Sequence, residues 1–351
     1  MNRRFLVLLM ALILLTTAFA TSCQAIKDRF SNPTLDLTNQ GQDVTPDDDS
    51  EDDDDESGSA PAPTPITPAT TPDIDALGLV YTDCGGYYAV TGYRVEAGKE
   101  NELITLTIPS THKDLPVKTI GYRAFAPDAV SDNTNLANVI IPEGVTRIEA
   151  SAFAGCANLT SVTIPNTVTY MGMHAFDRCT SLTYINIPAS VTDIRVPAFS
   201  GCIRLASINV ASDNPKYTTI DGCLYSKDGK VLYRYPIGRI SEVKTESGTQ
   251  YTTYTIPDAV TTITESAFQG ADFTQIIIPA NVCRIERGAF KDCLKLERAR
   301  FAVTSGWWRT QSPEYETQGT VANVTNSYTM AEWLTKTSLG NNNFWLMRTV
   351  S

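Results

Sequence analysis

The sequence has little of the chemistry on which most enzymes depend. Its 2 histidines, His112 and His174, lie far apart in the chain, which argues against a histidine-based catalytic triad or a multi-histidine metal site. It contains no G-x-S-x-G, phosphate-binding or dinucleotide-binding motif. No two cysteines have the C-x-x-C spacing of a zinc site. We therefore expect a protein without catalysis, metal or cofactor.

Charge is also scarce in the part of the chain that can form a core. The formal net charge is −11, but residues 24–76 alone hold fourteen acidic side chains against Lys27 and Arg29. Residues 77–351 are left with a net charge of about −1. A neutral domain behind an acidic segment offers no electrostatic attraction to nucleic acid or to an anionic membrane surface.

The chain does contain a clear repeat. Three copies of 23 residues follow one another without a gap over Ile141–Asn209: IPEGVTRIEASAFAGCANLTSVT, IPNTVTYMGMHAFDRCTSLTYIN and IPASVTDIRVPAFSGCIRLASIN. They share the template I-P-x-x-V-x-x-[IM]-x-x-x-A-F-x-x-C-x-x-L-x-x-[VI]-x. A fixed period of this length indicates stacked coils, each of which buries its apolar side chains against its neighbours.

Each part of the template has a physical role. Val162 and Ile164 are two residues apart, so both should face inward on a strand that ends at Pro165. Val168 and Met171 should line a second, shorter wall of the coil. We expect a short helical turn at the Ala-Phe pair, with the aromatic ring filling the interior. The phenylalanines that should stack inside are Phe153, Phe176 and Phe199.

The cysteine of the template occupies one position in successive coils. It recurs as Cys156, Cys179 and Cys202, and again later as Cys293. Coils stack about 4.8 Å apart, which is within the Cα separation of a disulfide, but equivalent side chains point the same way. We therefore expect these cysteines to be buried free thiols that behave as small apolar side chains.

The string I-P-x-x-V-x-x-I-x-x-x-A-F-x-x-C-x-x-L-x-x-V resembles the bacterial BspA-like (type 5) leucine-rich repeat, over roughly residues 80–305. The resemblance implies an α/β solenoid with one parallel β-sheet of about eight strands and short helical turns on the other side. It also implies a hairpin insertion near residues 213–239 and caps outside the repeat. BspA-like proteins are associated with binding host matrix proteins or other cells, so the resemblance implies recognition without catalysis.

The first residues predict export and a lipid anchor. Residues 1–22 place Arg3 and Arg4 before an apolar run, which is typical of a signal peptide. Residues 20–23 read Ala-Thr-Ser-Cys and resemble a bacterial lipobox, in which the cysteine, Cys23, becomes lipidated. The usual pattern has Leu or another large aliphatic residue where this sequence has alanine, so ordinary secretion is the alternative.

Three further segments are predicted. Residues 23–76 form a disordered acidic and Pro/Thr-rich tether, whose acidic run Asp47–Glu56 is a solvated spacer or, alternatively, a cation-binding or sorting signal. The solenoid and its N-terminal cap occupy residues 77–305. The aromatic-rich residues 306–351 form a C-terminal cap or, alternatively, an aromatic platform for a carbohydrate or a partner.

The outward positions of the predicted strands, which we call the strand face, are the surface on which a partner should bind. They are rich in hydroxyl and amide side chains, have Tyr184 as an aromatic anchor, and carry charge only in the last row. Threonine and serine also favour solvent-facing strand positions, so a purely structural role is the alternative. The candidate positions are Thr105, Thr107, Asn138, Ile140, Ser161, Thr163, Tyr184, Asn186, Ser207, Asn209, Thr253, Thr255, Gln275, Ile277, Arg298 and Arg300.

Together these features predict a monomeric, exported protein, anchored to a bacterial membrane through Cys23 and exposed on the outer surface. Its expected partner is an unidentified protein of a host matrix or a cell surface, and not a nucleic acid. One alternative is a carbohydrate-active enzyme on a parallel β-helix, which would need clustered acidic side chains that the strand rows lack. The other alternative is a periplasmic structural scaffold.

Overall fold

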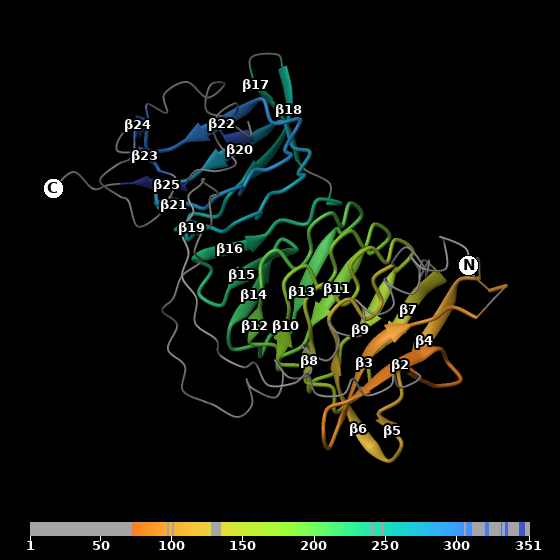
Figure 1. Ribbon diagram of the computed structural model, residues 1–351. Helices are drawn as coiled ribbons and strands as arrows, with labels where there is room; N and C mark the ends of the chain where they lie inside the picture. Colours follow the sequence, from red (N-terminus) through yellow and green to blue (C-terminus); the bar gives the residue numbers. More distant parts are fainter. Residues whose placement is uncertain are drawn as a thin grey trace, which may run out of the picture. The chain divides into compact units, whose positions relative to one another are not determined.

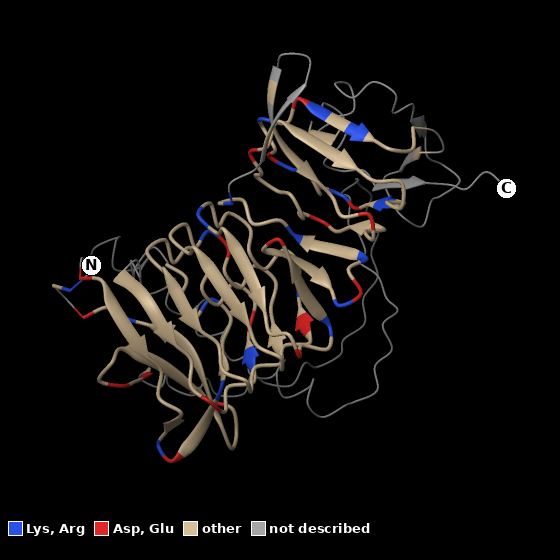
Figure 2. Cartoon of the chain, turned by 180° about the vertical axis from the view of Figure 1, so that it is seen from behind, with Lys and Arg blue, Asp and Glu red and all other residues tan. Residues whose placement is uncertain are grey.

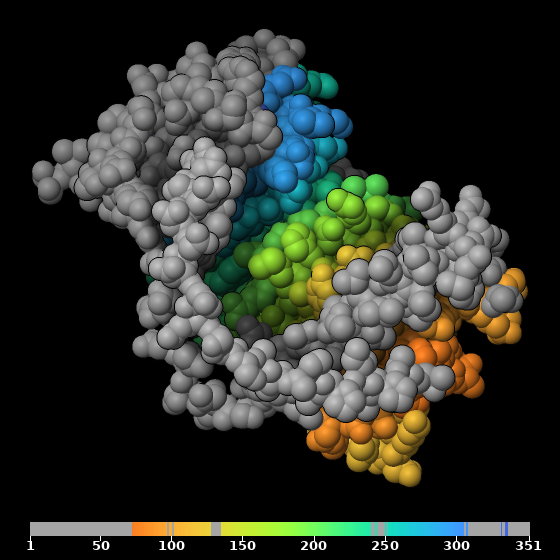
Figure 3. Space-filling model, viewed as in Figure 1, coloured from red at the N-terminus to blue at the C-terminus, as the bar shows by residue number. Residues whose placement is uncertain are grey.

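The computed structural model describes residues 72–96, 98–99, 102–127, 135–239, 242–246, 249–304, 307–310, 320–322, 331, 334–335 and 344–347. The compact unit that carries the repeats begins at Asp73, just before the expected boundary at residue 77. The predicted signal peptide, the lipidation site Cys23 and the acidic run lie outside the described residues. Within this unit the coils follow one another in chain order, so the colours pass gradually from yellow through green to blue (Figure 1, Figure 3).

The longer strand of each coil lies at the L-x-x-V-x-I segment of the template, as predicted. We call these strands together the first sheet. They pair in parallel as β4-β7-β9, β11-β13 and β18-β20-β22, so the expected single sheet is divided into three ladders (Figure 1). The strands are β4 (Ile104–Thr107), β7 (Leu136–Ile140), β9 (Ser161–Thr163), β11 (Tyr184–Ile187), β13 (Ser207–Val210), β18 (Thr249–Thr255), β20 (Gln275–Ile278) and β22 (Arg298–Phe301).

A second set of parallel strands forms two ladders, β3-β6-β8-β10-β12 and β16-β19-β21, which we together call the second sheet. Within the regular coils its strands lie at the V-x-x-[IM] segment of the template. In the central coils Ile148, Met171 and Ile194 are in register, and all three side chains are buried. The expectation of a single parallel sheet is therefore wrong, because the shorter wall is itself a sheet. Its strands are β3 (Tyr88–Tyr93), β6 (Leu115–Ile120), β8 (Arg147–Ile148), β10 (Tyr170–Met171), β12 (Asp193–Ile194), β16 (Val231–Arg234), β19 (Thr262–Ile263) and β21 (Arg284–Ile285).

The Ala-Phe segments form successive turns and not the short helical turns that the sequence predicted. A left-handed residue stands directly before the pair in most coils, and another follows shortly after it. Two left-handed residues this close together leave no room for a right-handed helix. The backbone bonds the next coil instead: the N–H of Phe153 donates to the carbonyl of Ala175 at 2.8 Å. The residues before the pair are Arg123 (φ 55°), Ser151 (56°), His174 (57°), Ser266 (58°) and Gly288 (68°).

The interior is built from ladders of identical side chains. Phe153, Phe176 and Phe199 are buried, as predicted, with at most 2% of each side chain exposed. Their rings stack nearly parallel, with centroids 5.2 Å apart between Phe153 and Phe176 and 5.8 Å apart between Phe176 and Phe199. Phe125 extends the stack by one coil, at 4.9 Å from Phe153. Stacking of this kind adds to the burial energy of each ring.

The template cysteines are buried and unbridged. Each thiol donates to the carbonyl oxygen of the phenylalanine one coil earlier, so the cysteine contributes a weak hydrogen bond as well as apolar volume. Burial raises the pKa of the Cys156, Cys202 and Cys293 thiols to about 12, and raises the pKa of the Cys179 thiol well above its ordinary value. The donor–acceptor pairs are Cys156 to Phe125 (3.2 Å), Cys179 to Phe153 (3.2 Å), Cys202 to Phe176 (3.0 Å) and Cys293 to Phe268 (3.0 Å).

An antiparallel segment lies between the coils at residues 217–234. It comprises β14 (Tyr217–Ile220), β15 (Cys223–Ser226) and β16, with the turn between β15 and β16 at Asp228-Gly229. Strand β16 then pairs in parallel with β19 and so joins the second sheet. The buried Arg234 links the segment to the next coil, since its guanidinium donates to the carbonyls of Ser266 at 2.6 Å and Gln269 at 3.3 Å.

Antiparallel strands flank the coils. Before them, β1 (Asp73–Ile74) and β2 (Leu79–Asp83) continue the second sheet from β3, and β5 (Thr111–His112) pairs with β6. After them, β25 (Phe344–Met347) pairs with β21 and with β23 (Trp307–Thr310), and β24 (Thr320–Ala322) pairs with β23. Strand β17 (Glu242–Glu246) pairs with β18. These pairings cover strand edges that would otherwise be free for another chain.

Candidate functional site

The outward side chains of β4, β7, β9, β11 and β13 form two rows across the first sheet, and we call this part the open strand face. The pairing register aligns the positions of the first row from Thr105 through Asn138 to Ser161, and those of the second from Thr107 through Ile140 to Thr163. On the neighbouring ladder Tyr184 pairs with Ser207 and Asn186 with Asn209. The side chains of these ten positions are exposed or half-buried.

Hydrogen bonds between neighbouring coils order the open strand face. Asn138 donates from Nδ2 to Thr105 Oγ1 at 3.1 Å, and it accepts on Oδ1 from the Ser161 hydroxyl at 2.6 Å. Asn209 donates from Nδ2 to Asn186 Oδ1 at 2.9 Å. These side chains are held before any partner arrives, so binding costs less conformational entropy than it would on a mobile surface.

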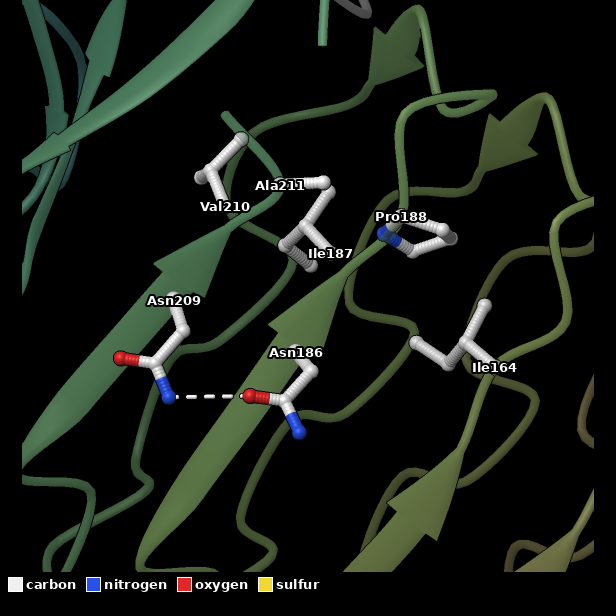
Figure 4. A pocket seen from close by; sticks show the side chains of 7 residues that line it. All are labelled: Ile164, Asn186, Ile187, Pro188, Asn209, Val210 and Ala211. Carbon is white, nitrogen blue, oxygen red and sulfur yellow. Dashed lines mark hydrogen bonds between the residues drawn. The ribbon is translucent and has the colours of Figure 1, made fainter. Parts of the chain in front are cut away.

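A shallow hollow of about 270 Å³ lies where β9, β11 and β13 end. Figure 4 shows aliphatic side chains on one side of it and the hydrogen-bonded pair Asn186 and Asn209 on the other. This hollow was not among the sites expected from the repeat template. The residues that line it are Ile164, Asn186, Ile187, Pro188, Asn209, Val210 and Ala211.

A break in the template marks the position of the hollow. The chain has Ile187-Pro188 where one coil begins, but Val210-Ala211 at the equivalent place of the next coil. Valine and alanine are smaller than isoleucine and proline, so this corner is less filled. The loss of the Ile-Pro pair after three regular copies was the signal that could have revealed the site.

The strand face is not open along its whole length. Thr253 and Gln275 point outward by register, since their neighbours Tyr254 and Ile276 face the core, yet they are only 3% and 0% exposed. The prediction that Thr253 and Gln275 are accessible to a partner is therefore wrong, because both sides of the strands are covered at that row. The remaining candidates of this part are exposed at Thr255 and Arg300 and half-buried at Ile277 and Arg298.

Charge is distributed differently over the two sheets. No charged residue occurs among the ten positions of the open strand face, and Figure 2 shows charged residues mostly in turns and at the ends of strands. The second sheet carries charge on its outward row, where the guanidinium of Arg147 lies 3.8 Å from the ring centroid of Tyr170 and contacts Glu149 at 2.6 Å. Among the described residues, no group of three or more acidic, histidine or cysteine side chains could hold a metal ion.

The comparisons with known proteins agree with the coil geometry. Residues 118–228 and 244–310, about half of the chain, match the family model "BspA type Leucine rich repeat region" in 6 copies. In the part of the chain that the structure describes, no helix is long and apolar enough to cross a membrane. A search of curated proteins finds no match.

Several solved structures are similar to this chain. The pneumococcal vaccine antigen PcpA is 19% identical, with 66% of this chain and 70% of that chain covered and a TM-score of 0.41. A leucine-rich cell surface protein from Faecalibacterium prausnitzii is 25% identical, with 66% and 77% covered and a TM-score of 0.41. A leucine-rich repeat protein from Eubacterium ventriosum is 21% identical, with 66% and 71% covered and a TM-score of 0.42.

Proposed function

This chain belongs to the BspA-type leucine-rich-repeat family, and we propose that it is a protein-interaction module displayed outside the cell, without catalysis. The observation that carries the proposal is the open strand face, which is uncharged, ordered by hydrogen bonds and accessible on five neighbouring strands. A fixed surface of this kind suits a protein partner, because little ordering is needed on binding. Its role in the cell would be adhesion or recognition of host or neighbouring-cell proteins.

Surface display is part of the same proposal and rests on the leader, the lipobox-like residues at Cys23 and the tether. Replacing Cys23 with alanine should move the protein from the detergent phase to the aqueous phase in a detergent-partitioning experiment. Unchanged partitioning would show that Cys23 is not lipidated. Digestion of intact cells with an external protease then separates surface display from a periplasmic scaffold, because only a displayed domain is cleaved.

The binding proposal is tested at Tyr184, which is 46% exposed and is the aromatic residue of the open strand face. Truncating an aromatic residue at the centre of an interface typically costs about 2 kcal/mol or more, roughly thirtyfold in affinity. The full chain is used to isolate a protein partner by cross-linking, and the dissociation constant is then measured for the wild type and for Tyr184→Ala.

The control is deletion of the acidic run, residues 47–56, which should leave the affinity unchanged. Because the open strand face carries no charge, binding should also depend only weakly on salt concentration. If Tyr184→Ala binds as tightly as the wild type while the deletion abolishes binding, the open strand face is a scaffold only.

A further inference from the structure

We propose that the hollow at the ends of β9, β11 and β13 binds a short, extended and uncharged segment of the partner protein, with one aliphatic side chain of that segment seated in it. This inference rests on the proposed function and names the kind of peptide that the open strand face recognises. It follows from five properties of the hollow: its lining, its size, its shape, its polar rim and its lack of charge.

The lining selects an aliphatic group. Five of the seven lining residues are aliphatic or proline: Ile164, Ile187, Pro188, Val210 and Ala211. No aromatic ring lines the hollow, so nothing there offers the flat stacking surface that sugar rings use. An aliphatic side chain entering from water would gain hydrophobic burial against this lining, whereas a polar side chain would lose hydration and would find polar groups only at Asn186 and Asn209.

The size suits a side chain better than a free small molecule. A cavity of about 150 Å³ holds a benzene molecule, whereas pockets for drug-sized ligands have about 300–1,000 Å³. The hollow, at about 270 Å³, lies between these sizes. It has room for one branched side chain and part of the backbone that carries it.

The shape suits an extended backbone. The hollow runs across three neighbouring strand ends, a span of about 10 Å at a strand spacing of about 4.8 Å. Three residues of extended chain cover about the same length.

The polar rim offers a hydrogen bond to such a backbone. Asn209 donates to Asn186 Oδ1, and the amide nitrogen of Asn186 has no hydrogen-bond partner among the described residues. In Figure 4 this nitrogen points away from Asn209, so it is available to a backbone carbonyl of a bound segment.

Charge complementarity excludes acidic and basic segments. None of the residues that line the hollow is charged, nor is any position of the open strand face. A charged side chain seated there would lose its hydration without gaining an ion pair. The partner segment that binds here therefore has an uncharged residue in the hollow and uncharged residues on either side of it.

The test uses the full chain with isotope-labelled isoleucine and valine methyl groups and three probes. Two are blocked peptides, Ac-Gly-Ser-Thr-Leu-Thr-Ser-Gly-NH2 and the same peptide with Asp in place of Leu, and the third is the neutral sugar maltotriose. We expect the Leu peptide to shift the methyl resonances of Ile164 and Val210. The Asp peptide should bind about tenfold to a hundredfold more weakly, in line with the burial of one aliphatic side chain.

Two matched variants locate the site. Ala211→Asp places a charge in the hollow, and Thr111→Asp places the same charge on the exposed strand β5, away from the open strand face. Binding of the Leu peptide should be lost in the first variant and retained in the second. The assignment would be overturned if both peptides bound equally well or if only maltotriose shifted the methyl resonances. It would also be overturned if Ala211→Asp bound the Leu peptide as well as the wild type does, or if millimolar Leu peptide produced no shift. These outcomes leave the Tyr184→Ala measurement with the intact partner unaffected, so failure of the hollow and failure of the proposed function are distinguishable.

Discussion

The coils before strands β14 to β16 (residues 104–210, the leading coils) and those after them (residues 249–301, the trailing coils) share two features of the interior, the stacked phenylalanines and the cysteine hydrogen bond. In the leading coils Phe153 and Phe176 stack 5.2 Å apart, and in the trailing coils Phe268 and Phe290 stack 4.9 Å apart with ring planes at 12°. The cysteine of each part also bonds the preceding phenylalanine carbonyl. The template therefore determines what faces inward in both parts of the chain.

The two parts differ in what surrounds the stacked phenylalanines. Phe268 packs against Tyr235, Tyr254 and Phe273 as well as against Phe290, so the trailing coils replace a simple stack with a mixed aromatic cluster. The outward row is covered at Gln275 in the trailing coils, whereas the open strand face stays accessible in the leading coils. The inward residues repeat because packing constrains them, and the outward residues are free to differ.

The largest expected effect comes from breaking the ring stack. Phe176 has a stacked ring on each side, whereas the only ring stacked on Phe290 among the described residues is Phe268. Phe176→Ala should reduce the free energy of unfolding by about 3–5 kcal/mol, and Phe290→Ala should cost less. Denaturant unfolding followed by circular dichroism measures both, with Phe176→Leu as the volume control. A larger loss for Phe290→Ala would contradict the role of the continuous stack.

A smaller effect should separate the covered row from the open one. Gln275 and Tyr184 occupy equivalent strand positions, but Gln275 is 0% exposed and Tyr184 is 46% exposed. Gln275→Lys should lower the free energy of unfolding by about 3 kcal/mol, because it moves a charge from water into a fully buried position. Tyr184→Lys should change it by no more than about 0.5 kcal/mol, as is usual for a surface substitution. Thermal unfolding of both variants decides the matter, and equal losses would remove the distinction between the rows.

The smallest effect, when counted per pH unit, concerns alkaline pH and should be the same in both parts. Burial raises the pKa of the Cys202 and Cys293 thiols from 9.0 to about 12. The folded state therefore keeps protons that the unfolded state has lost, and the stability that each thiol contributes falls between pH 9 and 12 by about 1.4 kcal/mol per pH unit. Below pH 9 this contribution is fully present.

Denaturant unfolding at several pH values measures this slope. Replacing Cys202 with alanine, or Cys293 with alanine, should make the alkaline loss less steep by about 1.4 kcal/mol per pH unit in either part. An unchanged slope in one variant would mean that its thiol ionises as easily in the folded state as in the unfolded state.

The sequence predicted the long strands and the phenylalanine stack because both depend on inward positions that the template repeats. It did not predict the second sheet, since the spacing between Val168 and Met171 fits a turn as well as a strand that only neighbouring coils complete. The turns at the Ala-Phe pairs were also missed. Their left-handed residues include Ser151 and His174, and such residues give no glycine signal in the sequence.

The candidate site was predicted in part. Alternation along β9 and β11 placed Ser161, Thr163 and Tyr184 on the outward side, where the structure has them. Burial of Gln275 could not be predicted, because periodicity reports the side of a strand and not what lies over it. The hollow could have been found from the smaller pair Val210-Ala211, had the break in the template been interpreted as a change in volume.

The hydrogen bonds between coils have a mechanical consequence. The N–H of Ser151 donates to the carbonyl of Met173, and the N–H of Gly155 donates to that of Asp177, so these bonds join one coil to the next along the stacking direction. A pulling force in that direction loads the coils in series, and each coil holds only its neighbours. Under tension the coils should therefore detach one after another. Each 23-residue coil that detaches would add roughly 75 Å of extended chain, while the folded stack would shorten by only one coil spacing of about 4.8 Å. The domain would therefore lengthen stepwise under load.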